Sequence, residues 1–185
     1  MAGSNGLHVR NVALFGHGGV GKTMLVEHVL NKAGATTRLG SIEEGNTVTD
    51  FLDEEIQHKH TIALKPVYLE WKETRVHLVD NPGYADFLGE VAACAPVVDG
   101  AIIVIDGHSG PQVGTDHAFK YTDQYQTPRA IFINKMDMDN SDFDHVVNQI
   151  QESYGIRCVP LVIPVGQGQG SRPGRTPILP TRSQS

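Results

Sequence analysis

The sequence predicts an α/β protein with a doubly wound, mostly parallel sheet that contains one antiparallel strand. Three observations predict it: apolar runs alternate with segments of helical period, a glycine-rich turn joins the first run to the first helix, and two early strand-like runs are separated by three residues. The composition, 39% hydrophobic and 19% charged over 185 residues, excludes a wholly disordered or collagen-like chain. At roughly 150 residues per domain, this length fits one domain and a short tail.

The first half of the chain begins with a predicted strand at His8–Phe15, which stops at a glycine-rich turn, and a predicted helix at Lys22–Lys32. Residues 33–60 show no sustained period and carry clustered acidic residues, which predicts a long connection with one short helical turn. The runs Thr61–Trp71 and Arg75–Asp80 are separated by a hairpin-length loop and are expected to pair antiparallel.

The second half alternates helices and strands, as a parallel sheet requires. The expected elements are a helix at Phe87–Ala95, a strand at Ala101–Ile105, a helix at Val113–Tyr125, a strand at Ala130–Ile133, a helix at Phe143–Tyr154 and a strand at Leu161–Val165. The main domain is therefore expected at 11–165, after an N-terminal extension at 1–10. Residues 166–185 are rich in Gly, Pro, Ser and Gln with three arginines and no acidic residue, which predicts a disordered basic tail.

Charge and hydropathy exclude several classes of protein. The formal net charge is −6, which argues against nucleic-acid binding through bulk charge, so no direct DNA binding is expected. No apolar stretch approaches the roughly 20 residues of a membrane span, and the first ten residues lack the features of a signal or transit peptide. A cytoplasmic monomer is the expectation. Cys94 and Cys158 lack paired metal or redox spacing and are expected to be buried thiols.

A phosphate-binding motif joins the first strand to the first helix, the context that this motif requires. Its residues, which match G-x-x-x-x-G-K-[ST], are Gly16, His17, Gly18, Gly19, Val20, Gly21, Lys22 and Thr23. In such a P-loop the backbone N–H groups surround the β-phosphate, the lysine bridges the β- and γ-phosphates, and the hydroxyl ligates Mg²⁺. The motif therefore predicts a nucleoside triphosphate site with Lys22 and Thr23 in these roles.

Two further short elements follow the P-loop along the chain. Asp80-Asn81-Pro82-Gly83 ends the second hairpin strand, so that Asp80 is expected near Mg²⁺ and the Gly83 N–H near the γ-phosphate. The run Asn134-Lys135-Met136-Asp137 ends a later strand and matches N-K-x-D. The Asp137 carboxylate can accept two hydrogen bonds from guanine, and adenine offers no matching donors. GTP and GDP are thus favoured over adenine nucleotides.

These elements and the words around them make residues 11–166 resemble a translational GTPase G domain of the elongation factor G-like group. The resembling words include Glu54–Ile62, Pro82–Phe87, Asp99-Gly100-Ala101 and Gln112-Val113-Gly114-Thr115. The resemblance implies a P-loop GTPase fold, GTP hydrolysis accelerated by the ribosome, and Mg²⁺ held by Thr23, Thr61 and Asp80. It also implies guanine selection by Asn134 and Asp137, with Lys135 lying against the base.

The chain departs from the family pattern in two site residues and at its end. Tyr84 stands where elongation factor G carries His, and a phenol does not become a cation at neutral pH as imidazole can; Tyr84 would instead orient a water by hydrogen bonding. Gly19 replaces the family's P-loop aspartate. The last strand and helix of the family domain, with its fifth guanine element, would follow an insert beyond Gly166, so a truncated or frameshifted product lacking both is the expectation.

The motifs leave alternatives open. The leading hypothesis is a slow GTPase in which Lys22, Thr61, Gly83 and Tyr84 act in hydrolysis. The alternative is a nucleotide-binding interaction module, or an inactive fragment, that binds without hydrolysing. An ATP-using enzyme is disfavoured by the N-K-x-D element, and a zinc site at His58 and His60 is disfavoured because closed sites usually need four ligands at definite spacing.

Overall fold

A computed structural model describes residues 8–155, 159–165 and 172–173. The described chain divides into two compact units, one formed by residues 8–105 and 112–132, the other by 106–111 together with the described residues from 133 onward. The predicted extension lies outside the described residues up to residue 7, and the predicted tail lies outside them except for residues 172–173.

The main sheet has five strands in the order β2-β3-β1-β4-β5. The strands are β1 (His8–Phe15), β2 (Lys65–Trp71), β3 (Thr74–Asp80), β4 (Gly100–Asp106) and β5 (Arg129–Asn134). β1 runs parallel to both β3 and β4, whereas β2 pairs antiparallel with β3. The predicted mostly parallel sheet with one antiparallel strand is confirmed.

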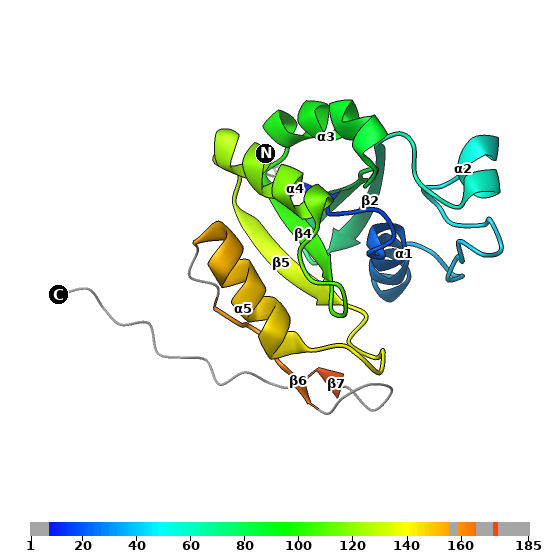
Figure 1. Cartoon of the computed structure of the whole chain (residues 1–185). Coiled ribbons are helices and arrows are strands. Elements are labelled where there is room, and N and C mark those ends of the chain that lie inside the picture. The colour runs from blue at the N-terminus through cyan, green and yellow to red at the C-terminus, as the bar shows by residue number, and fades with distance from the viewer. Residues whose placement is uncertain (1–7, 156–158, 166–171, 174–185) are drawn as a thin grey trace. The chain divides into compact units, whose positions relative to one another are not determined.

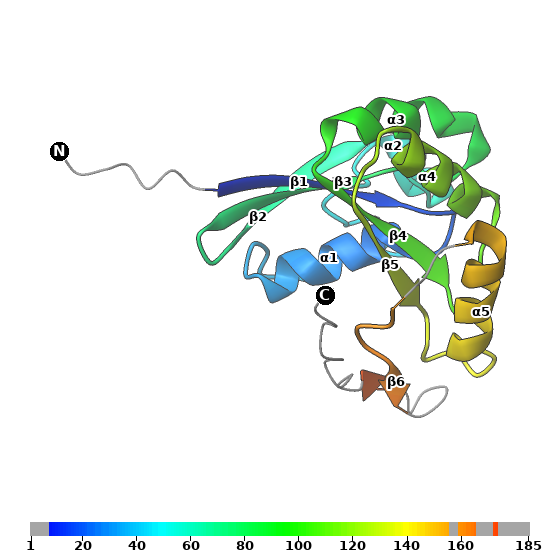
Figure 2. The same cartoon turned by 90° about the vertical axis from the view of Figure 1, so that its left-hand side faces the viewer.

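Helices cover both faces of the sheet in the first unit (Figures 1 and 2). The helix α1 (Lys22–Lys32) lies on one face, and α3 (Leu88–Cys94) and α4 (Val113–Gln124) lie on the other. Strand side chains alternate between the faces, so Leu14 and Val104 join the core beneath α1, whereas Phe15 and Ile103, also fully buried, point to the opposite face. This doubly wound arrangement is the predicted one.

The second unit contains a helix and a small hairpin. The helix α5 (Phe143–Tyr154) is capped at its N-terminus by Asp142, whose carboxylate accepts the backbone N–H of His145 at 2.9 Å. The boundaries of α5 are those expected. The strands β6 (Pro164–Val165) and β7 (Arg172–Pro173) pair antiparallel with each other. The expected sheet strand at Leu161–Val165 is therefore wrong, because only its last two residues are extended and they belong to a separate two-stranded sheet.

The hairpin of β2 and β3 in the main sheet begins later than the sequence predicts. Residues 61–64 are irregular and β2 starts at Lys65, because the backbone N–H groups of Ile62 and Ala63 bind the Glu55 carboxylate instead of a neighbouring strand. The expected helical turn in the connection is α2 (Asp53–His58). The expected helix at Phe87–Ala95 is α3, flanked by the 3₁₀ turns η1 (Ala85–Phe87) and η2 (Ala95–Val97). Within the described ranges no helix is long and apolar enough to cross a bilayer.

Candidate functional site: a phosphate-binding loop with a hydroxyl–carboxylate network

The P-loop turns away from the end of β1 into the first turn of α1. Gly16 lies so close to Val104 that a Cβ would be 2.3 Å from the Val104 carbonyl oxygen, and its φ of 142° suits only glycine. The Lys22 ammonium donates hydrogen bonds to the carbonyl oxygens of Gly16 (3.1 Å) and His17 (2.9 Å). The loop is thus folded around the amine that a P-loop turns toward phosphate.

Burial governs the charge of this lysine. Lys22 is only 6% exposed, and burial lowers its pKa to about 8, although the nearby carboxylates of Asp80 and Asp50 act in the opposite direction. An anion placed beside the ammonium would favour its charged form further. The site therefore holds a buried cation whose natural partner is a negatively charged ligand.

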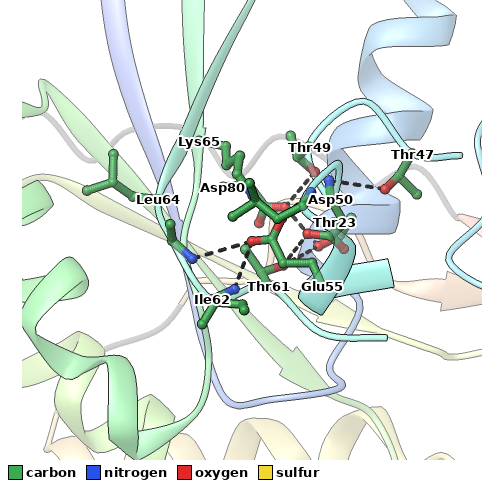
Figure 3. A network of polar contacts seen from close by, with 12 residues as sticks. Thr23, Thr47, Thr49, Asp50, Glu55, Thr61, Ile62, Leu64, Lys65 and Asp80 are labelled. Carbon is green, nitrogen blue, oxygen red and sulfur yellow. Dashed lines mark hydrogen bonds and ion pairs between the residues drawn. The ribbon is translucent and has the colours of Figure 1, made fainter. Parts of the chain in front are cut away.

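A network of hydroxyl and carboxyl groups includes Thr23, the residue that follows this lysine (Figure 3). The Thr23 hydroxyl donates to Asp80 Oδ2 at 2.8 Å and lies 3.1 Å from the Thr61 hydroxyl. Thr61 in turn donates to Asp50 Oδ1 at 2.8 Å, and Thr49 donates to Asp80 Oδ2 at 3.0 Å. The α1 start, the β3 end and the connection thus contribute to one cluster.

The same cluster contains two carboxylate oxygens without a hydrogen-bond partner. Asp80 Oδ1 and Asp50 Oδ2 are both buried and unpaired, and the two residues are 0% and 5% exposed. Burial raises the pKa of Asp80 to about 6 and raises that of Asp50, although hydrogen bonds from threonine hydroxyls favour the carboxylates. Oxygen donors from two carboxylates and two hydroxyls are the ligand type that Mg²⁺ prefers, so these residues fit a magnesium ion.

The turn after β3 packs directly on the P-loop. A Cβ at Gly83 would lie 2.4 Å from Lys22 Nζ and 2.6 Å from the Gly18 nitrogen. A Cβ at Gly18 would lie 2.7 Å from Cζ of Tyr84, so the phenol end of that ring rests on the P-loop backbone. The His60 ring meets the Tyr84 ring edge-on, with centroids 5.0 Å apart. The structure therefore brings together the four residues expected to act in hydrolysis, which are Lys22, Thr61, Gly83 and Tyr84.

Three glutamates hold the long connection, residues 33–64. Glu27 of α1, which is fully buried, accepts the backbone N–H groups of Gly40 (2.9 Å) and Val48. Glu55 of α2 is also fully buried; it accepts the N–H groups of Ile62 and Leu52 and forms an ion pair with Lys65 (Figure 3).

Glu90 of α3 is the third, and it accepts the N–H of Leu64 at 3.0 Å. The hydrogen bonds of these three glutamates fix the backbone of the connection, so that Thr61 and Asp50 lie in the cluster.

The N-K-x-D element lies in the second unit. Lys135 has a φ of 59°, in the left-handed region, and its ammonium lies 2.9 Å from Asp106 Oδ2. Burial opposes ionisation of Asp106, but Lys135 and the N–H groups of His108 and Ser109 outweigh it and lower its pKa. Asp137 is exposed, so its carboxylate is accessible to a ligand. Asn134 accepts the Gly107 N–H through its carbonyl at 2.8 Å, which fixes this turn.

The sequence motifs contain the P-loop, D-x-P-G and N-K-x-D residues but miss two residues of the cluster and one that holds the connection beside it. Asp50, Thr49 and Glu27 are fully or almost fully buried, and none belongs to a motif that the sequence displays. The available signal was the run Thr47-Val48-Thr49-Asp50, in which polar residues recur inside an acidic, aperiodic connection. Cys94 is buried as expected, and Cys158 lies outside the described residues. Across the described part of the chain no group of three metal-ligating His, Cys, Asp or Glu residues occurs, including around His58 and His60.

Comparisons with known proteins agree on one family. Residues 7–180 match the family described as "Elongation factor Tu GTP binding domain". The chain is 37% identical over 158 residues to ribosome-releasing factor 2, mitochondrial, of Culex quinquefasciatus, covering 85% of this chain and 21% of that protein. Elongation factor G of Gluconobacter oxydans is 37% identical over 158 residues, covering 85% and 23%.

A solved structure has the same fold as this chain. A crystal structure of a protein from Thermus thermophilus superimposes with a TM-score of 0.83 at 31% identity, covering 94% of this chain and 29% of that one. The chain therefore spans less than a third of the length of these relatives.

Proposed function

Since the chain belongs to the elongation factor Tu GTP-binding domain family, and within it resembles elongation factor G-like translational GTPases, we propose that it binds GTP and GDP and hydrolyses GTP. The observation that carries the proposal is the convergence of Thr23, Thr61 and Asp80 beside the buried Lys22 ammonium. Phosphoryl transfer depends mainly on positioning and on neutralising phosphate charge, and this cluster is built for both.

Magnesium belongs to this proposal because the cluster fits it. Thr23, Thr61 and Asp80 would hold the ion, with the unpaired oxygen of Asp50 beside them. When bound, Mg²⁺ supplies positive charge to the phosphate oxygens. The buried carboxylates, whose pKa values burial raises, would then return to their ionised form.

The chain's own residues supply the remaining steps. Lys22 would release the carbonyl oxygens of Gly16 and His17 and turn its ammonium to the β- and γ-phosphates. The Gly83 N–H would bind a γ-phosphate oxygen, which its closeness to Lys22 supports. Tyr84, whose phenol end rests on Gly18, would orient the attacking water through its hydroxyl. Water would attack the γ-phosphorus, the bond to the β-phosphate oxygen would break, and GDP and phosphate would leave.

The base would be chosen by the element after β5. Asp137 would accept the two guanine N–H groups, Asn134 would select guanine together with it, and the Lys135 side chain would lie against the base. The exposed Asp137 carboxylate and the Lys135–Asp106 ion pair support these roles. Adenine would leave the Asp137 acceptors unsatisfied, so GTP and GDP should compete and ATP should not.

A titration and a single-turnover assay test the proposal together. Fluorescent GDP with Mg²⁺ is bound to the chain and displaced with GTP or ATP, and release of phosphate from bound GTP is then followed. Lys22→Ala should abolish both signals. Lys32→Ala, an exposed lysine in the last turn of the same helix, is the matched control and should change neither. Displacement by ATP as effective as by GTP would refute the choice of base.

A second candidate is a module that binds nucleotide without hydrolysing it. The observation that favours it is Tyr84, since a phenol replaces the family's imidazole and rests on the P-loop backbone. Under this alternative GTP binds with an affinity comparable to GDP, and no phosphate appears in the single-turnover assay. Release of phosphate by the wild type, absent in Lys22→Ala, would exclude it.

Partners and location are also proposals, because the relatives are much longer than this chain. The names of the relatives support ribosome association, which sedimentation of the chain with ribosomes and a non-hydrolysable GTP analogue would test. We expect a monomer without direct DNA contact. The relatives include proteins named mitochondrial as well as bacterial elongation factors. A cytoplasmic location is therefore a proposal, which cell fractionation would test.

A further inference from the structure

The first residues of the P-loop are packed against glycines on two sides. On one side, a Cβ at Gly114 of α4 would lie 2.5 Å from His17 Cα and 2.8 Å from the His17 nitrogen. On the other side, a Cβ at Gly83 would lie 2.6 Å from the His17 carbonyl carbon. Since real Cβ atoms essentially never approach within 3.0 Å, neither position accepts a side chain unless the backbone of His17 moves.

Gly83 belongs to the D-x-P-G element, whereas Gly114 lies in a stretch that resembles the family but has no assigned contact with phosphate, metal or base. Gly114 is the second residue of α4, and the sequence motifs assign it no role. The helix α4 packs against the Cα and nitrogen of His17, whereas the turn after β3 packs against its carbonyl carbon. The P-loop position is therefore set partly by a helix that supplies none of the predicted phosphate, metal or base contacts.

The start of α4 is itself held firmly. Thr115 is buried; it donates its backbone N–H to the Gln112 carbonyl at 2.7 Å and accepts the Gln112 N–H through its hydroxyl at 3.1 Å. Ala118 and Phe119, one turn later, are also buried. Because the helix cannot easily move away, any atom added at residue 114 would displace the P-loop at His17.

His17 in turn determines where the phosphate-binding groups lie. Its carbonyl oxygen accepts from the Lys22 ammonium at 2.9 Å, and the next residue, Gly18, carries the N–H that packs against Gly83. A shift of a few tenths of an ångström at His17 therefore moves the lysine and the loop amides together.

We propose that Gly114 is a positioning residue for nucleotide binding: its missing side chain lets α4 hold the His17 backbone, and with it the adjoining loop amides, in the geometry that phosphates require. This inference rests on the proposed nucleotide binding and adds to it a residue outside the binding motifs. The contact would act on the phosphate end of the ligand, leaving the N-K-x-D element unaltered.

The test compares two Gly→Ala variants in helices. Gly114→Ala adds a Cβ that meets the His17 backbone, whereas Gly89→Ala in α3 adds one that meets nothing within 4 Å. Alanine has the higher helix propensity at both positions, so Gly89→Ala should bind fluorescent GDP within twofold of wild type. Gly114→Ala should bind it at least about tenfold more weakly, through faster dissociation. Equal affinities for the two variants would overturn the inference.

Two further measurements keep the outcome decisive. If Gly114→Ala does not fold, Thr115→Val removes the hydroxyl that accepts the Gln112 N–H without adding bulk, and should weaken GDP binding about two- to fivefold; unchanged binding would overturn the inference. If the folded wild type binds no GDP, the proposed function fails. In that case amide hydrogen exchange across residues 16–23 tests the positioning role of Gly114. The exchange rate should be higher in Gly114→Ala than in wild type and unchanged in Gly89→Ala. Unchanged exchange in both would refute it.

Discussion

Replacing Glu55 with Gln should destabilise the fold strongly, because this carboxylate is the partner of a buried ammonium. Glu55 is fully buried and the Lys65 side chain is 8% exposed. Glutamine can still accept one backbone N–H, but it has no charge to pair with Lys65, whose buried ammonium is left with the Phe51 ring and the charge of Asp50. Breaking a buried pair in this way costs about 3–5 kcal/mol. For a domain of this size, that loss lowers the melting temperature by roughly 6–20 °C.

Urea unfolding followed by circular dichroism measures this loss, and two further variants locate its cause. Glu54→Gln removes the neighbouring exposed carboxylate of α2 and should change the free energy of unfolding by less than about 0.5 kcal/mol. In the double variant Glu55→Gln/Lys65→Met no buried charge is left unpaired, so it should regain more than half of the loss. A double variant that is less stable than Glu55→Gln alone would refute the reasoning.

The pH dependence gives an independent check on the same residue. Burial alone would raise the pKa of Glu55, but Lys65 and the N–H groups of Ile62 and Leu52 outweigh it and hold the pKa below its ordinary value of 4.5. A lowered carboxylate pKa stabilises the fold above the unfolded value, and this contribution is lost as the pH falls through the folded value. The stability difference between wild type and Glu55→Gln should thus be largest near pH 7 and shrink below about pH 4.5; a constant difference would contradict this.

Three other changes test the site from different directions. Asp137→Asn should weaken binding of fluorescent GDP by at least about 100-fold, because the guanine donors lose their acceptor; a loss under threefold would contradict the base assignment. Asp50→Asn should raise the Mg²⁺ concentration needed for half-maximal GTP binding by about 10- to 100-fold, and an unchanged requirement would separate Asp50 from the metal. Glu27→Ala leaves the N–H groups of Gly40 and Val48 without their acceptor and should cost about 2–5 kcal/mol in urea unfolding; a loss below about 1 kcal/mol would contradict its anchoring role.

Most regular elements were predictable because local pattern and tertiary structure agree. The strand before the P-loop stops at Gly16, where the backbone conformation and the nearness of Val104 both demand glycine. The amphipathic period of α5 and the Asp142 cap together give its boundaries. At these places a single residue type marks the change of structure, so the sequence alone is sufficient.

The elements that escaped prediction depend on partners distant in sequence. Residues 61–64 carry strand-forming residues, but a carboxylate from α2 and another from α3 take their backbone N–H groups. Periodicity reports which face of an element is apolar and cannot reveal such side-chain acceptors. Asp50 was missed for the same reason: its role comes from Thr61, eleven residues later, and from a connection without regular structure.

The replacement of the family's histidine by Tyr84 is best understood together with the residues around it. The ring atom that approaches closest to the place of a Gly18 Cβ is Cζ, which bears the hydroxyl; an imidazole has no atom at that reach. The Cζ end of the phenol ring therefore lies on Gly18, and glycine is the residue that admits it. An imidazole at this position would not bring a ring atom to the place of Cζ beside Gly18, and it would alter the edge-on contact with the His60 ring, whose centroid is 5.0 Å from that of the tyrosine ring. Tyr84 is thus one member of a packed set with Gly18 and His60, and its proposed role in hydrolysis depends on that packing.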